Sequence, residues 1–158
     1  MFNPVPYFED LKNKLKLTKD KYKFSTISGI SELEGILSSR KRHQFQIAVD
    51  DSENGVTMQG QGRGYFERRP YTVFLCAVGK YDDMAKREAI LQELRTIYRA
   101  FLSKILLDGA NDGLILFDTT RTAFYELPGS FADGVVGLYF IVTVDNQIDL
   151  TYESADWE

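Results

Sequence analysis

The sequence contains very few of the residues on which metal sites, disulfide bridges and many nucleophilic active sites depend. Among its 158 residues there is one cysteine, Cys76, and one histidine, His43. A single thiol cannot close an intrachain disulfide, and no set of cysteines and histidines has the spacing of metal ligands. His43 lies in a polar stretch at the start of a predicted strand, where a solvated imidazole is the ordinary outcome. We therefore expect no metal, no cofactor and no enzymatic activity.

Long hydrophobic runs are missing as well. No apolar run approaches the roughly 18 residues of a membrane span, and the first residues lack the layout of a signal peptide. The chain is 44% apolar and 27% charged, which is typical of one globular domain with a hydrophobic core. We therefore expect a single domain over residues 1–158, in the cytoplasm and without a membrane partner.

Basic residues are absent from the last part of the chain. Every lysine and arginine lies between Lys12 and Arg121, whereas residues 122–158 carry seven acids: Glu126, Asp133, Asp145, Asp149, Glu153, Asp156 and Glu158. The net charge is +3 before this division and −7 after it. The division predicts either a solvated acidic edge or one half of a contact with a basic surface on a neighbouring copy. A pI near 5.1 argues against a specific nucleic-acid partner, although six lysines from Lys12 to Lys23 form a local basic strip.

Apolar spacing predicts helices over three segments: residues 7–17, 29–37 and 82–107. The first is a short amphipathic helix, and the Pro-Val-Pro segment before it is expected to be extended because proline restricts its own backbone and that of the preceding residue. The second has one or two turns, with Ser31 and Glu34 as a capping box. The third is one long helix with an aspartate N-cap, and Gly109 is expected to end it.

Apolar alternation or continuity predicts β segments in several places: residues 22–26, 45–49, 71–78, 114–117, 123–127, 135–144 and 148–152. The third is nearly all apolar, which indicates a central strand buried on both faces. Asp145 and Asn146 predict a hairpin tip before the last segment, and Gly137 indicates a bulge or a close approach of another segment. The sequence thus predicts an α+β fold: a mostly antiparallel sheet of four to six strands packed against one long helix, with a short N-terminal helix.

Two pairs of neighbouring aspartates are candidates for metal binding or acid–base catalysis. Asp50-Asp51 and Asp82-Asp83 could supply oxygen ligands to Mg²⁺. Each pair also lies where a turn or a helix cap favours aspartate, and we expect that structural role. Cys76 lies within a predicted buried strand, with no histidine or cation placed to lower its pKa, so we expect an unreactive thiol.

Residues 50–69 form a polar, glycine-rich stretch that predicts a long flexible loop. Neither a helix nor a Lys-Ser/Thr pair follows its glycines, so the stretch does not predict a phosphate-binding loop. It is either the tip of a hairpin or an arm that contacts a partner protein. In the second case we expect contacts from the cations and rings of the stretch and from acids of the C-terminal part: Arg63, Tyr65, Phe66, Arg68, Arg69, Asp145, Asp149 and Glu153.

The order of these features resembles one known family. A short N-terminal helix, a glycine-rich stretch before the β segment 71–78, a long helix with an acidic cap over residues 82–107, and terminal strands containing Gly-Leu-Tyr-Phe-Ile-Val-Thr-Val are similar in order and size to the tail terminator, or tail completion, proteins of long-tailed phages and prophages. In that family a small α+β subunit without enzymatic activity forms a hexameric ring, which caps the finished tail tube and provides the surface for joining the head.

The resemblance implies partners and a use for the divided charge. The chain is expected to assemble with copies of itself, with the tail tube and with head-connector proteins, in the host cytoplasm and in the virion. A ring requires head-to-tail contacts, in which an acidic edge of one subunit meets a basic face of the next. Two other classes are left open: a small-ligand-binding or regulatory domain with a pocket on the sheet face opposite the long helix, and an enzyme that uses Asp82, Asp83 or Asp118.

Overall fold

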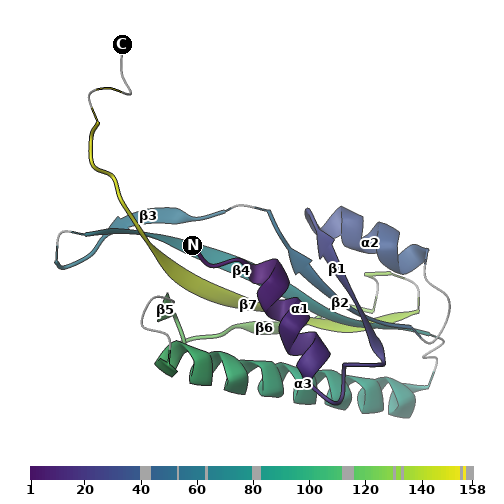
Figure 1. The fold of residues 1–158 in the computed structure, drawn as a ribbon. Helices are drawn as coiled ribbons and strands as arrows, with labels where there is room; N and C mark the ends of the chain where they lie inside the picture. The colour runs from purple at the N-terminus through teal and green to yellow at the C-terminus, as the bar shows by residue number, and fades with distance from the viewer. Residues whose placement is uncertain are drawn as a thin grey trace.

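The computed structural model describes residues 1–39, 44–52, 54–62, 64–79, 83–111, 116–129, 131–132, 134–153 and 155. In this part of the chain three helices and seven strands follow in the order α1 (Pro4–Lys14), β1 (Tyr22–Ile27), α2 (Ile30–Ser38), β2 (Gln44–Asp50), β3 (Val56–Gln59), β4 (Tyr65–Val78), α3 (Met84–Asn111), β5 (Leu116–Phe117), β6 (Phe124–Glu126) and β7 (Val135–Ile148). Figure 1 shows a long twisted sheet with α3 running beneath it. The predicted α+β class is confirmed.

All seven strands belong to one mixed sheet. Its order is β1-β2-β4-β7-β5, with β3 paired to β4 and β6 paired to β7. β1 and β2 are parallel, and all other described pairs are antiparallel. β4 and β7 pair along their entire length and form the long axis of the sheet. The strand number exceeds the predicted four to six because β3, β5 and β6 are short and add to the edges of these two long strands.

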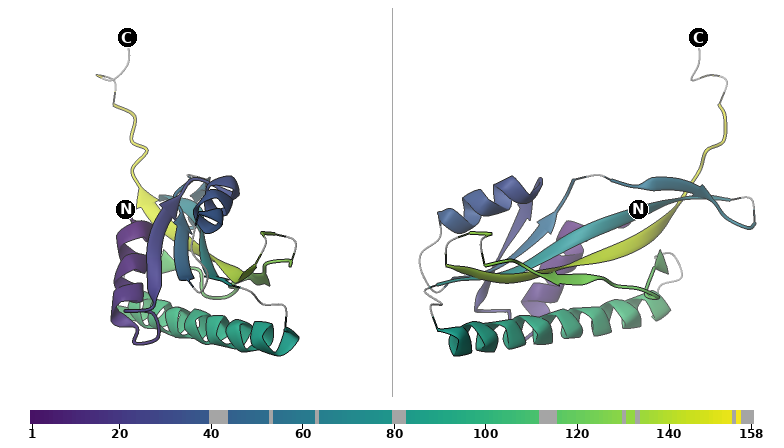
Figure 2. Two further views of the ribbon diagram at one scale, coloured as in Figure 1. Left: turned by 90° about the vertical axis from the view of Figure 1, so that its right-hand side faces the viewer. Right: turned by 180° about the vertical axis from the view of Figure 1, so that it is seen from behind.

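Helices cover both faces of the sheet, and each face has its own hydrophobic core. On one face Leu94 and Phe101 of α3 pack with Phe140 of β7, and α1 joins the same core. On the other face α2 packs through Leu33 and Leu37. Figure 2 shows α3 along one side of the sheet and α2 on the other side, at one end only. The fold therefore has three layers, of which the α2 layer is incomplete.

α1 begins earlier than predicted. Its first residue is Pro4, and the side chain of Asn3 accepts a hydrogen bond from the amide of Val5 at 3.2 Å. The prediction of an extended Pro-Val-Pro segment is wrong because proline fits the first helical turn, where an amide has no helical partner in any case. The helix ends at Lys14, and the turns that follow lead into β1, with Thr18 donating to the carbonyl of Lys12 at 2.7 Å.

α2 lies where a helix is predicted but has a different cap. Its N-cap is Gly29, which has a φ of 93° and makes no side-chain cap hydrogen bond. The predicted capping box of Ser31 and Glu34 is therefore wrong. Glu32 takes this role from within the helix, because its carboxylate accepts a hydrogen bond from the amide of Ser28 at 2.6 Å.

α3 is the long helix that the sequence predicts. The carboxylate of Asp83 accepts a hydrogen bond from the amide of Ala85 at 2.9 Å, so the aspartate cap is confirmed. The helix continues past Gly109 to Asn111, which contradicts the predicted end. The ring of Phe117 lies against Gly109, so packing of β5 stabilises a last turn that local sequence disfavours. No helix in the described residues is long and apolar enough to cross a membrane.

β4 and β7 both extend further than predicted at the end of the sheet remote from α2. β4 begins at Tyr65, so the predicted loop 50–69 contains the hairpin of β3 and β4. β7 continues to Ile148, which contradicts the predicted hairpin tip and return strand. Asp145 and Asn146 do not turn the chain, because they pair across the sheet with β4. The buried Asn146 also accepts a hydrogen bond from the amide of Phe2 at 2.8 Å.

Candidate interaction surface

One end of the sheet projects beyond the helices as a three-stranded ribbon. It consists of β3, residues 65–70 of β4 and residues 143–148 of β7, and we call it the arm. Figures 1 and 2 show the arm extending past the end of α3, and the chain after Ile148 leaves from the outer end of β7 within the arm. Most predicted contact residues lie here: β4 holds Tyr65, Phe66, Arg68 and Arg69, and β7 holds Asp145. Arg63 lies outside the described residues.

Arg68 and Asp145 form an ion pair across the arm. They are directly opposite in the β4–β7 register, and the guanidinium donates from Nε and from a terminal nitrogen to the two carboxylate oxygens, each at 2.8 Å. The pKa of Arg68 is raised above its ordinary value because it donates these bonds to Asp145. Asp118 lies 4.0 Å from the same guanidinium. A residue pair predicted to contact a partner is therefore joined within the chain.

The second arginine of the arm is also paired. Arg69 donates from Nε to the carboxylate of Glu67 at 2.8 Å, and it lies on the opposite face of β4 from Arg68 because side chains alternate along a strand. The basic stretch and the acidic C-terminal strand thus lie side by side in one ribbon. A contact between the acidic edge of one subunit and the basic face of the next would require these two regions to lie on opposite sides of the subunit. Here they are neighbours.

The face of the arm on the α2 side has no helix over it. α2 and the segment around Leu127 cover the near end of this face, but they do not reach the arm. Val56, Met58, Phe66 and Leu116 point to the same side as the ion pair by their register. Val56 is 62% exposed, Met58 37% and Leu116 58%. We call these four apolar side chains the arm face; they flank the Arg68–Asp145 pair, and exposed apolar groups gathered on one face are typical of protein–protein contacts.

The arm face borders a groove of about 490 Å³. Three glycines of the β3–β4 hairpin form one wall, and side chains of the three neighbouring strands form the rest: Tyr65, Phe66, Leu116, Asp145 and Gln147. The glycines leave this wall without side chains, so an approaching backbone can come close. The groove is open and lined mainly by apolar and neutral groups, which suits a protein segment.

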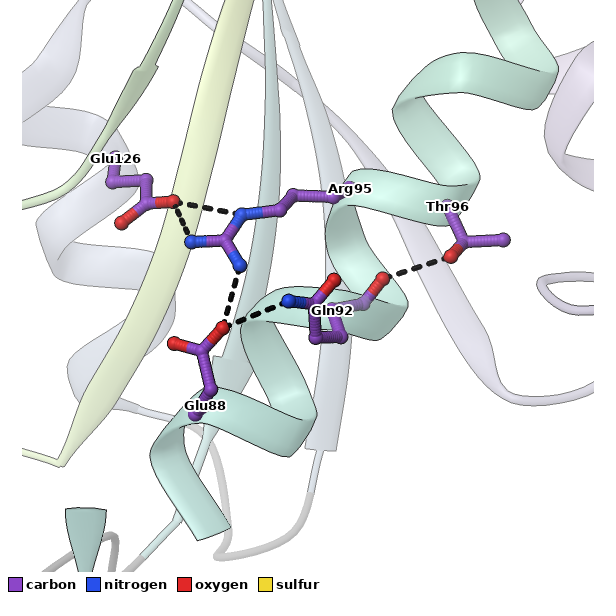
Figure 3. A network of polar contacts seen from close by, with 5 residues as sticks. All are labelled: Glu88, Gln92, Arg95, Thr96 and Glu126. Atoms are coloured by element: carbon purple, nitrogen blue, oxygen red, sulfur yellow. Dashed lines mark hydrogen bonds and ion pairs between the residues drawn. The ribbon is translucent and has the colours of Figure 1, made fainter. Parts of the chain in front are cut away.

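A second exposed aromatic site lies on β6. Phe124 and Tyr125 are each about half exposed, and Tyr125 stacks on Tyr139 with ring centroids 5.1 Å apart. Figure 3 shows how the strand is held: Arg95 of α3 donates from Nε to Glu126 at 3.0 Å. The same guanidinium donates to Glu88 at 2.7 Å, and Gln92 donates to Glu88 too. This network fixes β6 on α3 and leaves its rings at the surface.

None of the residues described beyond β7 pairs with the sheet. Asp149 accepts hydrogen bonds from the amide and the hydroxyl of Thr151 at 2.9 and 2.6 Å, and these bonds lower its pKa. Leu150 is 56% exposed, and Glu153 is exposed. Of the three acids predicted to contact a partner, Asp149 and Glu153 are exposed, whereas Asp145 is bound to Arg68.

The candidate catalytic groups have structural roles where the structure describes them. Asp50 accepts hydrogen bonds from the amide and hydroxyl of Ser52, and Asp51 accepts one from the Ser28 hydroxyl at 2.7 Å. Burial raises the pKa of Cys76 to about 12. Among the described residues no group of three or more His, Cys, Asp or Glu side chains could hold a metal ion. The candidate residues His43 and Asp82 lie outside the described residues.

Comparison with known proteins identifies no relative that could assign a role to these residues. No protein-family model matches the sequence, and no curated protein matches it. The functional inference therefore depends on the geometry of the arm and the C-terminal segment, and on the resemblance in element order described above.

The sequence interpretation missed the apolar part of the arm face. Val56, Met58 and Leu116 lie in or beside stretches that are polar and rich in glycine or aspartate. The available signal was the short alternation Val-Thr-Met-Gln in β3, which has the period of a strand. Four residues of that pattern are too few to stand out in a glycine-rich stretch.

Proposed function

We propose that the chain is a non-enzymatic assembly protein that associates with copies of itself into a ring, caps a phage or prophage tail tube, and joins tail to head. The observation that carries the proposal is the arm, a sheet extension with one face that bears exposed apolar side chains around an internal ion pair and is uncovered by any described helix. The choice of a phage tail as the assembly rests on the resemblance in element order to tail terminator proteins.

The chemistry of the arm favours a protein partner. Its central charges, Arg68 and Asp145, already satisfy each other through two hydrogen bonds, so a partner need not neutralise them. The surrounding side chains of Val56, Met58 and Leu116 are exposed and apolar. Burying such groups around a satisfied polar pair is typical of protein interfaces, in which charges at the centre are paired and apolar groups supply the free energy.

Self-association is tested by size-exclusion chromatography with light scattering over a range of concentrations. We expect the wild-type chain to form a closed oligomer, visible as rings by negative-stain electron microscopy. Met58→Lys places a charge on the arm face and should weaken the oligomer. Thr57→Lys is the matched control, because Thr57 is an exposed neighbour on the opposite face of the same strand. A chain that stays monomeric at every concentration would contradict the proposal.

The role on a tail has its own test. Because the proposed role is to cap the tail and provide the surface for joining the head, adding the purified chain to tails of its own phage that lack it should restore joining. Genes for a tail tube, a tape measure or a portal beside the gene of this chain would agree with that outcome. An oligomer that does not bind such tails would leave self-association standing and overturn the assignment to tails.

A further inference from the structure

The chain beyond β7 keeps the alternation of a strand after the sheet has ended. The ladder of β4 and β7 stops at the pair Tyr65 and Ile148, and the chain then projects away from the body of the molecule (Figure 1). Apolar and polar residues alternate over residues 149–153, which we call the C-terminal segment: Asp149, Leu150, Thr151, Tyr152 and Glu153. The period of two and the two acids describe a strand with one apolar and one acidic face.

The outer edge of β1 is open. β1 is the terminal strand of the sheet order, so no strand in the described chain pairs with its outer side. Tyr22 and Phe24 belong to the core on the α1 side, whereas Lys23 points to the opposite face and is exposed. Lys19, just before the strand, is exposed too. Neither lysine forms an ion pair with a residue that the structure describes.

We propose that the C-terminal segment of one copy adds to the outer edge of β1 of a second copy as a further strand. This inference rests on the self-association proposed above and specifies one contact of it. The apolar residues of the segment then extend the face of Tyr22 and Phe24, and its acids lie on the face of Lys23. Backbone hydrogen bonds supply the affinity, and the matching faces supply the specificity.

The segment cannot make this contact within its own chain. In the register of the sheet, Lys23 pairs with Gln46, and Gln46 pairs with Cys76 of β4. The segment leaves the sheet opposite Tyr65, at the far end of β4. The eleven residues from Tyr65 to Cys76 span roughly 36 Å of strand. Five residues of fully extended chain span at most about 17 Å. The acceptor must therefore belong to another molecule, and the contact is head-to-tail, as a ring requires.

Charge distinguishes β1 from the other open edges. β3 and β5 contain no charged residue, and β6 contains Glu126. An acidic strand gains no charge pairing at β3 or β5, meets at β6 an acid that is already paired with Arg95, and is attracted to the lysines beside β1. A lysine on an edge strand also discourages pairing with neutral or basic strands. Lys23 therefore protects the edge and selects an acidic partner.

The test exchanges charge between two variants of the full chain. D149K/E153K reverses the segment, and K19E/K23E reverses the acceptor. Each variant alone brings like charges together, so we expect its self-association in low salt to be roughly tenfold weaker than wild type. An equimolar mixture of the two variants pairs opposite charges at every contact and should regain association. The chain with all four substitutions should regain it as well.

Backbone pairing is tested separately with Thr151→Pro, because proline has no amide to donate to a ladder. Thr151→Val keeps the amide and is the control. A wild-type oligomer that all these variants leave unchanged overturns this inference and leaves the proposed function standing, whereas a wild-type chain that is always monomeric overturns both. An effect of D149K/E153K without an effect of K19E/K23E would place the segment elsewhere and overturn β1 as its acceptor.

Discussion

Gly137 is the position in β7 where another segment approaches most closely. A Cβ atom added there would lie 2.6 Å from Cδ1 of Leu127, 3.1 Å from Sγ of Cys76 and 3.1 Å from the carbonyl oxygen of Leu75. The sequence predicts a bulge or a close approach at this residue, and the close approach is confirmed. A side chain is disfavoured here because two of the three contacts come from the adjacent central strand β4, whereas the third is the end of a flexible leucine side chain.

We expect Gly137→Ala to lower the free energy of unfolding by about 2 kcal/mol, because an added methyl group overfills a packed site. Urea denaturation of the purified variant measures the change. Gly35→Ala is the matched control: a Cβ at this helical glycine meets nothing within 4 Å, so alanine should be neutral or stabilise the chain by up to about 1 kcal/mol. Equal stability of the two variants would show that the site at Gly137 can relax.

Cys76 lies in the central strand β4, and its buried thiol is held in the neutral form. Because burial raises the thiol pKa to about 12, almost no thiolate forms near pH 8, and reagents cannot reach the sulfur. We expect an aromatic disulfide reagent to label the native chain only as fast as the chain unfolds, and at once in denaturant. Fast labelling of the native state would contradict both the burial and the assignment of Cys76 to the core.

Tyr7 joins α1 to the last turn of α3. Its hydroxyl donates to Asp108 at 2.9 Å, and Lys104 pairs with the same carboxylate. Burial raises the pKa of Tyr7. Burial also opposes ionisation of Asp108, but the hydrogen bonds from Lys104 and Tyr7 outweigh it and hold the carboxyl pKa below its ordinary value. The stabilisation is therefore present above the unfolded-state pKa and is lost as pH falls through the folded-state pKa.

We expect Tyr7→Phe to lower the free energy of unfolding by about 1 kcal/mol at neutral pH. The loss should shrink at an acidic pH below the folded-state pKa of Asp108, where the carboxyl is protonated and no longer a charged acceptor. Urea denaturation at the two pH values measures both differences. The same loss at both values would mean that the ionised carboxylate contributes nothing to the contact.

At the scale of elements, the arm depends on pairing across strands. Arg68 and Asp145 meet because β4 and β7 keep one register along their length, and the carboxylate is only 15% exposed. We expect a double-mutant cycle of Arg68→Ala and Asp145→Ala to show a coupling of about 1 kcal/mol. The cycle for Lys14 and Asp10, an exposed pair on α1, should give less than about 0.5 kcal/mol. A coupling no larger than this control would show that the pair does not hold the arm.

The elements that the sequence predicts correctly are those with a local cause, meaning a pattern visible among neighbouring residues of the chain. α3 shows an apolar periodicity that continues over many turns, and the central part of β4 is a continuous apolar run. The arm has no such cause. Asp145 and Asn146 resemble turn residues in sequence, and only their partners on β4 make them strand residues. Register between distant strands is a property of tertiary structure, so the pairing that builds the arm could not be predicted, whereas five of its residues were predicted as contact residues from the sequence.

For the whole molecule, the structure divides the acids of the C-terminal part into two groups. Glu126 and Asp145 are bound to Arg95 and Arg68 within the chain, whereas Asp149 and Glu153 are exposed beyond the sheet. The sequence could predict the excess of acid after Arg121 but not which acids are neutralised. Among the described acids after Arg121, those not bound to an arginine are therefore the two of the C-terminal segment.

This distribution predicts how salt acts on the assembled molecule. Raising sodium chloride from about 50 mM to about 500 mM shortens the Debye length severalfold, so a contact between the C-terminal segment and lysines should weaken roughly tenfold. Light scattering at fixed protein concentration measures the change. D149N/E153N is the control, because without the two charges the remaining association should depend little on salt. If association strengthens with salt instead, burial of apolar surface such as the arm face dominates the interface, because salt screens charges and does not weaken apolar burial.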